Sequence, residues 1–461
     1  MTNALEEKKM ANPNNLTTGN EAKTLIKFAM PYLLACFMQT FYGMVDLFVV
    51  GLYNTSSTTT AVSIGSQVTH MITVIIAGFA MGTTVKIGRT IGAGDDKEAK
   101  KAVGNTALFF CVFAIMMAVI LFVLTNEITK IMLTPVEAFD ETAAYLRICF
   151  IGVPFITMYN VISSIFRGAG DSKSPMYFVG VACVVNVALD FLLVGACGMG
   201  ATGAAVATII GQAMSSIIGL VVLLKKDLGF KISIKDIKIN GDVIKEILSV
   251  GTPIAIQDGL IQVAFIVITV IANSRGLIAA SGVGITEKII GFMFLVPSAF
   301  LSAISAITAQ NMGAGKPERA RKTLKYGLII VVCYGFFCAL YNQFLPDTLI
   351  GIFTRDEAVV AAGALYLMSY SFDVMFAGIH FCFSGYFCGD RKSIISFIHN
   401  IASIILIRIP GAYLASIWYP ESLYPMGWAA PLGSILSALI CIVFYVVIRN
   451  REKRQVASGN D

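Results

Sequence analysis

The chain has 461 residues, of which 56% are apolar and only 13% are Asp, Glu, Lys or Arg. Soluble domains carry roughly 45–50% apolar and about 25% charged residues, so the composition excludes a water-soluble enzyme, a disordered chain and a disulfide-stapled secreted protein. The net charge of +6 would suggest a nucleic-acid partner in a soluble protein, but in so apolar a chain the distribution of the charges matters more than their sum, and we expect no nucleic-acid partner.

Apolar runs long enough to cross a bilayer follow one another along the sequence. A spanning helix needs about 20 mainly apolar residues. The first 24 residues predict a disordered cytosolic tail. In chain order the expected spans are 25–51, 60–85, 102–125, 140–165, 175–196, 202–224, 246–273, 278–311, 324–345, 360–387, 393–417 and 427–448. The sequence therefore predicts an all-α membrane protein with twelve transmembrane helices.

The basic residues are distributed unevenly over the loops between these spans. Both termini and the loops on the same side, together with the span ends next to them, hold 28 of the 34 Lys and Arg residues, whereas the opposite loops hold only Lys130, Arg275 and Arg355. Cytoplasmic loops carry an excess of Lys and Arg. We expect a multi-pass protein of the cell membrane with both termini in the cytoplasm.

The chain repeats itself at a period of about 221 residues. The matched features are Pro31 with Pro253, Gly92–Gly94 with Gly313–Gly315, and Phe166–Asp171 with the shorter Phe387–Asp390. Six spans per copy predict two pseudo-symmetric six-helix lobes in the same orientation, as in transporters built from parallel repeats. The expected parts are a tail at 1–24, an N-lobe at 25–224, a Lys-rich linker at 225–245, a C-lobe at 246–449 and a tail at 450–461.

The first span contains a carboxylate about twenty residues after its start. An ionised side chain at the bilayer centre costs roughly 2.5–3.5 kcal/mol on insertion scales, so it usually faces the bundle interior and has a function. Asp46 has no basic residue within a helical turn. Gln39 and Tyr42 share its helical face, because the three are spaced i, i+3 and i+7.

The fifth and sixth spans add oxygen-bearing side chains. Asn186 and Asp190 are four residues apart and share a face of the fifth span, and Thr208 lies early in the sixth. With Asp46 they supply carboxylates, an amide and a hydroxyl, a set that suits a hard cation such as sodium. The carboxylates could instead hold a proton, or could simply fasten the two helices together. The sequence does not choose between sodium and a proton.

The sequence resembles the multidrug and toxic compound extrusion (MATE) family over about residues 25–450. The matching features are Pro31, Gln39 and Asp46, the helix ends Ile91–Gly94 and Phe166–Gly168, Asn186 and Asp190 before Gly198–Ala205, then Gln310–Lys316 and Arg408–Pro410. The resemblance implies an N-lobe cation site to which Asp46, Asn186, Asp190 and Thr208 correspond.

The C-terminal half also holds charged side chains within its spans. A sodium-coupled branch of the family carries a Glu eight residues after the proline of the seventh span, where this chain has Ile261, and Asp373 lies two residues out of register from another acidic position of that branch. Asp258 or Asp373 could form structural pairs with Lys288 or Arg408, or could contact substrate. The candidate substrate-binding residues are Gln39, Tyr42, Tyr159, Asp258, Gln262 and Asp373.

The sequence gives no sign of a cofactor or of an energy source other than an ion gradient. The three His residues, His70, His380 and His399, have no ligand spacing, and no phosphate-binding GxxxxGK[ST] pattern is present. The glycine-rich helix ends are expected to be C-caps. We therefore expect a non-enzyme with no cofactor, no resident metal and a proton or sodium ion as coupling ion.

Two other functions fit parts of the pattern. Asp95 and Asp171 each end a GxGD sequence typical of intramembrane aspartyl proteases, but both lie at helix ends beside lysines, where they would ionise. A flippase for lipid-linked precursors needs a basic cavity, and the spans contain few cations. The favoured interpretation is a monomeric, ion-coupled antiporter that exports amphipathic, often cationic, drug-like molecules by alternating access.

Overall fold

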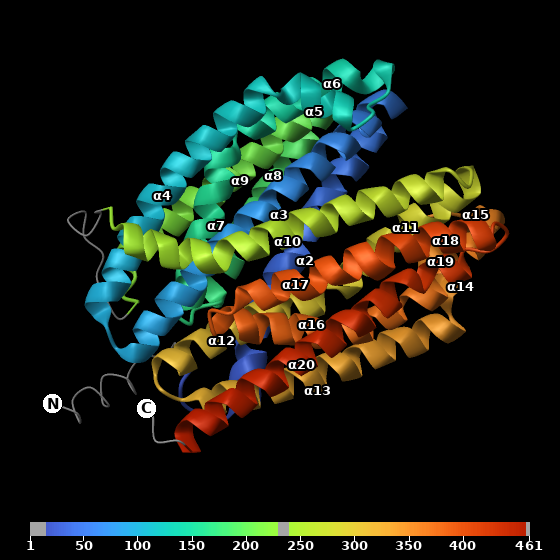
Figure 1. Cartoon of the computed structure of the whole chain (residues 1–461). Helices are drawn as coiled ribbons and strands as arrows, with labels where there is room; N and C mark the ends of the chain where they lie inside the picture. Colours follow the sequence, from blue (N-terminus) through green and yellow to red (C-terminus); the bar gives the residue numbers. More distant parts are fainter. Residues whose placement is uncertain (1–14, 229–238, 458–461) are drawn as a thin grey trace. The chain divides into compact units, whose positions relative to one another are not determined.

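The computed structural model describes residues 15–228 and 239–457, and their regular structure is helical throughout (Figure 1). These residues form two compact units. Unit 1 comprises residues up to Ala255 together with Ala309–Lys316, and unit 2 comprises Ile256–Thr308 and the chain from Pro317 onward. Much of the predicted linker, residues 229–238, lies outside the described residues.

Unit 1 is a bundle in which α8 packs against α2 and α9, and α3 packs against α6 and α7. Its elements, blue to green in Figure 1, are α2 (Glu21–Tyr53), α3 (Ser56–Ala93), α4 (Asp96–Val123), α5 (Thr125–Ile131), α6 (Val136–Ile151), α7 (Val153–Gly168), α8 (Lys173–Asp190), the π-helical turn η1 (Phe191–Ala196), α9 (Gly200–Lys225) and the first part of α10 (Gly241–Asn273).

Unit 2 is a second bundle, in which α16 packs against α13 and α20, and α11 packs against α15. Its elements are the rest of α10, α11 (Leu277–Met293), α12 (Leu295–Gly313) up to Thr308, α13 (Pro317–Phe344), α14 (Pro346–Ile350), α15 (Glu357–Tyr370), α16 (Phe372–Gly389), α17 (Ser393–Ser403), the π-helical turn η3 (Ile404–Arg408), α18 (Ile409–Trp418), α19 (Tyr424–Gly427) and α20 (Ala429–Ala457).

The helices confirm the predicted all-α membrane fold. Eleven helical segments within the described ranges are long and apolar enough to cross a bilayer, and the pair α6–α7 makes a twelfth if it counts as one span. That pair is bent by 47°, so the span predicted at 140–165 corresponds to two helices and not to one. Gly152 ends α6, and Pro154 follows in the first turn of α7. Proline lacks an amide donor for a continuous ladder, which explains a break here.

Polar side chains cap the starts of three helices, and a glycine ends one of them as predicted. Asn20, Thr55 and Asp95 accept backbone hydrogen bonds at the starts of α2, α3 and α4. Gly94 ends α3 with φ of 76°, a left-handed conformation that costs glycine little. The tail prediction is wrong for residues 15–24, because α2 begins at Glu21 and Leu16 is buried; residues 1–14 lie outside the described ranges.

Two glycines allow close backbone contact between α3 and the segment 309–316. A Cβ atom on Gly92 would overlap the carbonyl oxygen of Gln310, and one on Gly313 would overlap that of Arg89. The two contacts are equivalent under the internal repeat. Gly92 corresponds to Gly313, and Arg89 corresponds to Gln310, so each glycine contacts the counterpart of the residue three positions before it. The crossing therefore depends on glycine at both positions.

We expect Gly92→Ala to destabilise the protein by about 1–3 kcal/mol, because the added methyl must displace backbone and not a flexible side chain. Gly43→Ala is the matched control, since nothing lies within 4 Å of a Cβ built at Gly43 in the interior of α2. Thermal melting of detergent-purified protein should show a lower transition for Gly92→Ala only. Equal transitions in the two variants would contradict the proposed backbone contact.

Asp171, between α7 and α8, ties the end of α9 to the start of α8. Its carboxylate accepts hydrogen bonds from the backbone N–H groups of Lys173 and Ser174, from the Ser174 hydroxyl at 2.6 Å and from Lys226 Nζ at 2.7 Å. Burial by itself raises the pKa of Asp171, but the bonds from Lys226 and Ser174 outweigh it, so the pKa lies below its ordinary value.

A depressed carboxylate pKa contributes stability above the unfolded-state value, about 3.9, and this contribution is lost as pH falls through the folded-state value. Asp171→Asn should therefore melt at a lower temperature than wild type at pH 7, and the difference should shrink as pH falls from about 5 to 3. Melting curves across that range check the prediction, with the exposed Asp347→Asn as control. A difference that stays constant with pH would contradict it.

Candidate functional site

Three helices of unit 1 bring four oxygen-bearing side chains together. Asp46 projects inward from α2, Asn186 and Asp190 from the last turns of α8, and Thr208 from α9. Asp46, Asn186 and Asp190 are each at least 97% buried. Their positions follow from the i, i+4 spacing of Asn186 and Asp190 and from the packing of α8 between α2 and α9.

Thr208 is the hydrogen-bonding centre of this group. Its hydroxyl donates to Asp46 Oδ2 at 3.0 Å and lies 3.5 Å from Asn186 Nδ2. The carboxyl groups of Asp46 and Asp190 lie within hydrogen-bonding reach of each other. We call these four side chains, Asp46, Asn186, Asp190 and Thr208, the carboxylate cluster.

The carboxylate cluster contains more acceptor atoms than donors. Asp46 Oδ1, Asn186 Oδ1 and both carboxylate oxygens of Asp190 are buried without a hydrogen-bond donor, and no Lys or Arg of the described residues pairs with either Asp. A buried acceptor without a donor costs roughly 1–3 kcal/mol, and more when it is charged. A bound monovalent cation or a proton would satisfy these oxygens, so the residues present fit either ion.

α8 changes its winding where the cluster is located. Regular helix ends at Asp190 and the wider π-helical turn η1 follows over Phe191–Ala196. π-helical turns are rare and often occur at functional sites. The apolar side chains around this end of the cluster include Val49, Tyr145 and Val194, all almost fully buried, so they exclude bulk water.

The other predicted residues of unit 1 lie beside the carboxylate cluster. Tyr42, one turn before Asp46, accepts a hydrogen bond from Gln212 Nε2 at 2.9 Å. Gln39 lies within hydrogen-bonding reach of the Tyr42 hydroxyl, and Tyr159 is buried on α7. Gln212 was missed in the sequence, although its spacing of four residues after Thr208 places it on the same face of α9.

The predicted residues of unit 2 do not form one group. Asp258 contacts Gln257 at 3.4 Å, and Gln262 is half-buried one turn further along α10. Asp373, fully buried on α16, accepts from Arg408 Nη2 at 3.2 Å. Of the structural pairs that the sequence left open, the structure therefore shows Asp373 with Arg408.

This ion pair belongs to a buried polar chain that the sequence did not reveal. Arg408 Nη2 also donates to Ser434 Oγ at 2.8 Å, Ser434 Oγ lies 3.4 Å from His380 Nε2, and the His380 and His399 rings are 5.2 Å apart. His399 Nε2 bonds to Ser384 Oγ at 2.9 Å. We call this the unit 2 polar chain. Across residues 15–228 and 239–457 no three metal-ligating side chains come together.

α11 contributes a further carboxylate in unit 2. Glu287 accepts from the Thr269 hydroxyl of α10 at 3.3 Å, whereas the neighbouring Lys288 is exposed. The two adjacent charges on α11 therefore have different surroundings, as expected from the 100° between consecutive helix residues.

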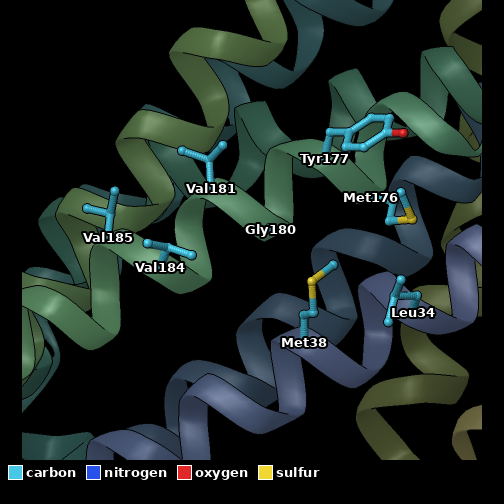
Figure 2. Close-up of a pocket in the computed structure, with 8 residues that line it drawn as sticks. All are labelled: Leu34, Met38, Met176, Tyr177, Gly180, Val181, Val184 and Val185. Atoms are coloured by element: carbon cyan, nitrogen blue, oxygen red, sulfur yellow. The ribbon is translucent and has the colours of Figure 1, made fainter.

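An apolar groove of about 430 Å³ runs between α2 and α8 of unit 1. Figure 2 shows Leu34 and Met38 on α2 facing α8, and Met38 lies 3.7 Å from a Cβ built on Gly180. Six residues of α8 complete the lining: Met176, Tyr177, Gly180, Val181, Val184 and Val185. Two methionines, Met38 and Met176, line the groove. They lie on the same two helices that carry Asp46 and Asp190.

The chain matches the MatE family model twice, over residues 31–192 and 253–414. The two matches begin at Pro31 and Pro253, which confirms the internal repeat. The chain is similar to a probable multidrug resistance protein, YpnP, of Bacillus subtilis (26% identity; 94% of this chain and 96% of the relative). It is also similar to the probable multidrug resistance protein NorM of Thermotoga maritima (26%; 94% of each).

The fold is that of a solved structure described as the outward-facing conformation of a multidrug resistance MATE family transporter of the MOP superfamily. The TM-score is 0.89 at 19% identity, covering 95% of this chain and 98% of that one.

Proposed function

Because the chain belongs to the MatE family, the multidrug and toxic compound extrusion (MATE) transporters, we propose that it exports amphipathic, often cationic, organic compounds across the cell membrane. Two relatives with 26% identity over nearly the whole chain carry the name multidrug resistance protein, which supports the proposal. Export is driven by entry of sodium or protons, with both termini in the cytoplasm and the monomer as the working unit.

The observation that carries this proposal is the set of four buried acceptor oxygens without donors in the carboxylate cluster. Two carboxylates enclosed by apolar side chains are costly unless each is neutralised or paired. A cation or proton bound there lowers the free-energy cost of burying the carboxylates, and release of that ion raises the cost again. Binding or release of an ion at the cluster can therefore change how stably α2, α8 and α9 pack together.

Coupling follows if the filled and empty clusters favour different conformations. An ion shifts such an equilibrium only by its difference in affinity for the two states. Asp46 is on a helix with a proline inside it, Pro31, and Asp190 adjoins the π-helical turn η1. Both helices therefore have a place at which their backbone can rearrange when the ion enters or leaves. The predicted lobes, 25–224 and 246–449, are the parts that move.

The groove between α2 and α8 supports the substrate class. Its lining is apolar apart from the tyrosine hydroxyl of Tyr177, and Met38 and Met176 contribute flexible thioethers. Methionine side chains adapt to different shapes, which is how promiscuous sites accept unrelated compounds. Asp46 and Asp190 lie on the same two helices as this lining, and their carboxylates favour a cationic group over an anionic one.

The rival functions fit the side-chain contacts less well. A pyrophosphate flippase needs several free cations in its cavity, but Arg408, one of the two candidates with Lys288, is paired with Asp373. A GxGD protease needs two aspartates in one dry site. Instead, Asp95 caps α4 by accepting from the Glu98 N–H group, and Asp171 is bonded to Lys226.

Reconstitution into liposomes tests the proposed function directly. Ethidium transport should be stimulated by an imposed ion gradient, and sodium and proton gradients applied separately should show which ion drives it. Ethidium should in turn accelerate flux of that ion. If neither gradient moves ethidium while a lipid-linked pyrophosphate is translocated, the exporter proposal is wrong and the flippase is favoured.

A further inference from the structure

Residues before the first helix are bound to the segment 309–316. The backbone N–H of Leu16 donates to Gln310 Oε1 at 3.1 Å, and the Leu16 carbonyl accepts from Asn311 Nδ2 at 3.2 Å. The Thr17 carbonyl accepts from Lys316 Nζ at 3.1 Å. Leu16 and Thr17 are only 5% and 8% exposed, so a stretch predicted to be a free tail is buried.

Gln310 joins three parts of unit 1. Its side-chain oxygen accepts from Leu16, and its side-chain nitrogen donates to the carbonyl of Gly168 at the end of α7, at 2.9 Å. Its own carbonyl oxygen lies against Gly92 of α3. The amide side chain of Gln310 thus links the N-terminal residues to the end of α7, and its backbone carbonyl packs against the end of α3.

The segment 309–316 belongs to a different unit from the chain on either side of it. Ala309–Lys316 is part of unit 1, whereas α12 up to Thr308 and α13 from Pro317 are part of unit 2. Any relative movement of the units must either break the bonds of this segment or bend the chain at residues 308–309 and 316–317. The bonds to Leu16 and Thr17 oppose that movement.

We propose that residues 15–17 form a latch, which ties the segment 309–316 to the start of α2 beside the segment's own contacts with the ends of α3 and α7, and that each transport cycle requires its release. The latch has three hydrogen bonds and one buried leucine, each weak alone because an intramolecular hydrogen bond contributes little net free energy. It is therefore suited to opening repeatedly. The release step rests on the proposed alternating-access function; the docked position of the latch does not.

Cysteine labelling tests the docked latch without any transport measurement. In the full-length protein, Thr17→Cys should react with a membrane-impermeant maleimide at least tenfold more slowly than the exposed Lys23→Cys, with wild type as the background of native cysteines. Adding Gln310→Ala should raise the Thr17→Cys rate severalfold, whereas the control Gly43→Ala should not. Equal rates for Thr17→Cys and Lys23→Cys in the otherwise native chain would refute the latch.

A cleavable cross-link tests the release. Bridging Thr17→Cys to Lys316→Cys with a disulfide-containing bismaleimide should lower ethidium export at least tenfold, and reduction should restore it. The two single variants and wild type, treated alike, should be unaffected. Export at the unbridged rate in the fully bridged protein would overturn the release step. Absence of export in unbridged and wild-type protein would instead refute the proposed function, with the labelling rates still deciding the latch.

Discussion

Replacement of Asp46 by asparagine is expected to abolish export, lowering ethidium efflux at least tenfold to the background of cells without the protein. The asparagine can still accept the hydrogen bond that Thr208 donates to Asp46, so the local fold should persist. The variant lacks the charge that the coupling ion must neutralise. Ion binding and release should therefore no longer change which conformation of α2 is favoured.

The stability of this variant should move in the opposite direction from its activity. Asp46 has no cationic partner within the described part of the chain, so neutralising it removes a buried charge without leaving another one unpaired. We expect unchanged expression and an equal or higher melting temperature. The matched control is Asp347→Asn, an exposed aspartate at the start of α14, which should export normally.

Asp190→Asn should lower efflux to a similar extent, and the double variant should be no worse than either single one. Residues that act as one unit give strongly non-additive effects. Wild-type efflux by Asp46→Asn at normal expression would refute the assigned role of the carboxylate cluster. Independent, multiplying effects of the two substitutions would show that the carboxylates act at separate sites.

Replacement of Asp373 by asparagine should have the largest effect on stability. Asp373 is fully buried and holds the Arg408 guanidinium, whose side chain is 13% exposed. Removing one partner of a buried ion pair leaves the other charge uncompensated, typically at a cost of about 3–5 kcal/mol. Ser434 would remain a partner of Arg408, but a hydroxyl carries no counter-charge.

The double variant Asp373→Leu with Arg408→Met is the control that separates charge from packing. Replacing both members of a buried pair by apolar residues of similar volume is often neutral or stabilising. Thermal melting should therefore show a large loss for Asp373→Asn and substantial recovery in the double variant. Asp258→Asn should lose less, since Asp258 accepts a hydrogen bond from the neutral Gln257 and forms no ion pair within residues 15–228 and 239–457. A wild-type melting temperature for Asp373→Asn would contradict a stabilising pair.

The two aspartates show what sequence alone can and cannot distinguish. Both are carboxylates inside apolar runs, so both are expected to be functional or paired. Asp46 was assigned to a cation site from its oxygen-bearing companions and from the family resemblance, and α2, α8 and α9 place it beside Asn186, Asp190 and Thr208. Asp373 had several candidate partners, and the packing of α16 and η3 against α20 brings Arg408 and Ser434 beside it.

The N-terminal residues show the same limit. Residues 15–20 are polar enough to predict a tail, because a short polar stretch gives no local signal of burial. Leu16 and Thr17 are buried only because Gln310, Asn311 and Lys316, almost 300 positions later, supply their hydrogen-bond partners. No window of sequence contains both sides of that contact.

The sequence by itself determined the twelve apolar spans, the repeat that begins at Pro31 and Pro253, and helix ends such as Gly94. Each of these depends on neighbouring residues: the length of an apolar run, the spacing of a motif or the φ angle that glycine permits. The tertiary structure alone decided the convergence of the carboxylate cluster, the partner of Asp373, the pairing of His380 with His399 and the docking of Leu16. These depend on the rotation of one helix against another, which is set by side-chain packing across the whole bundle and not by any local pattern.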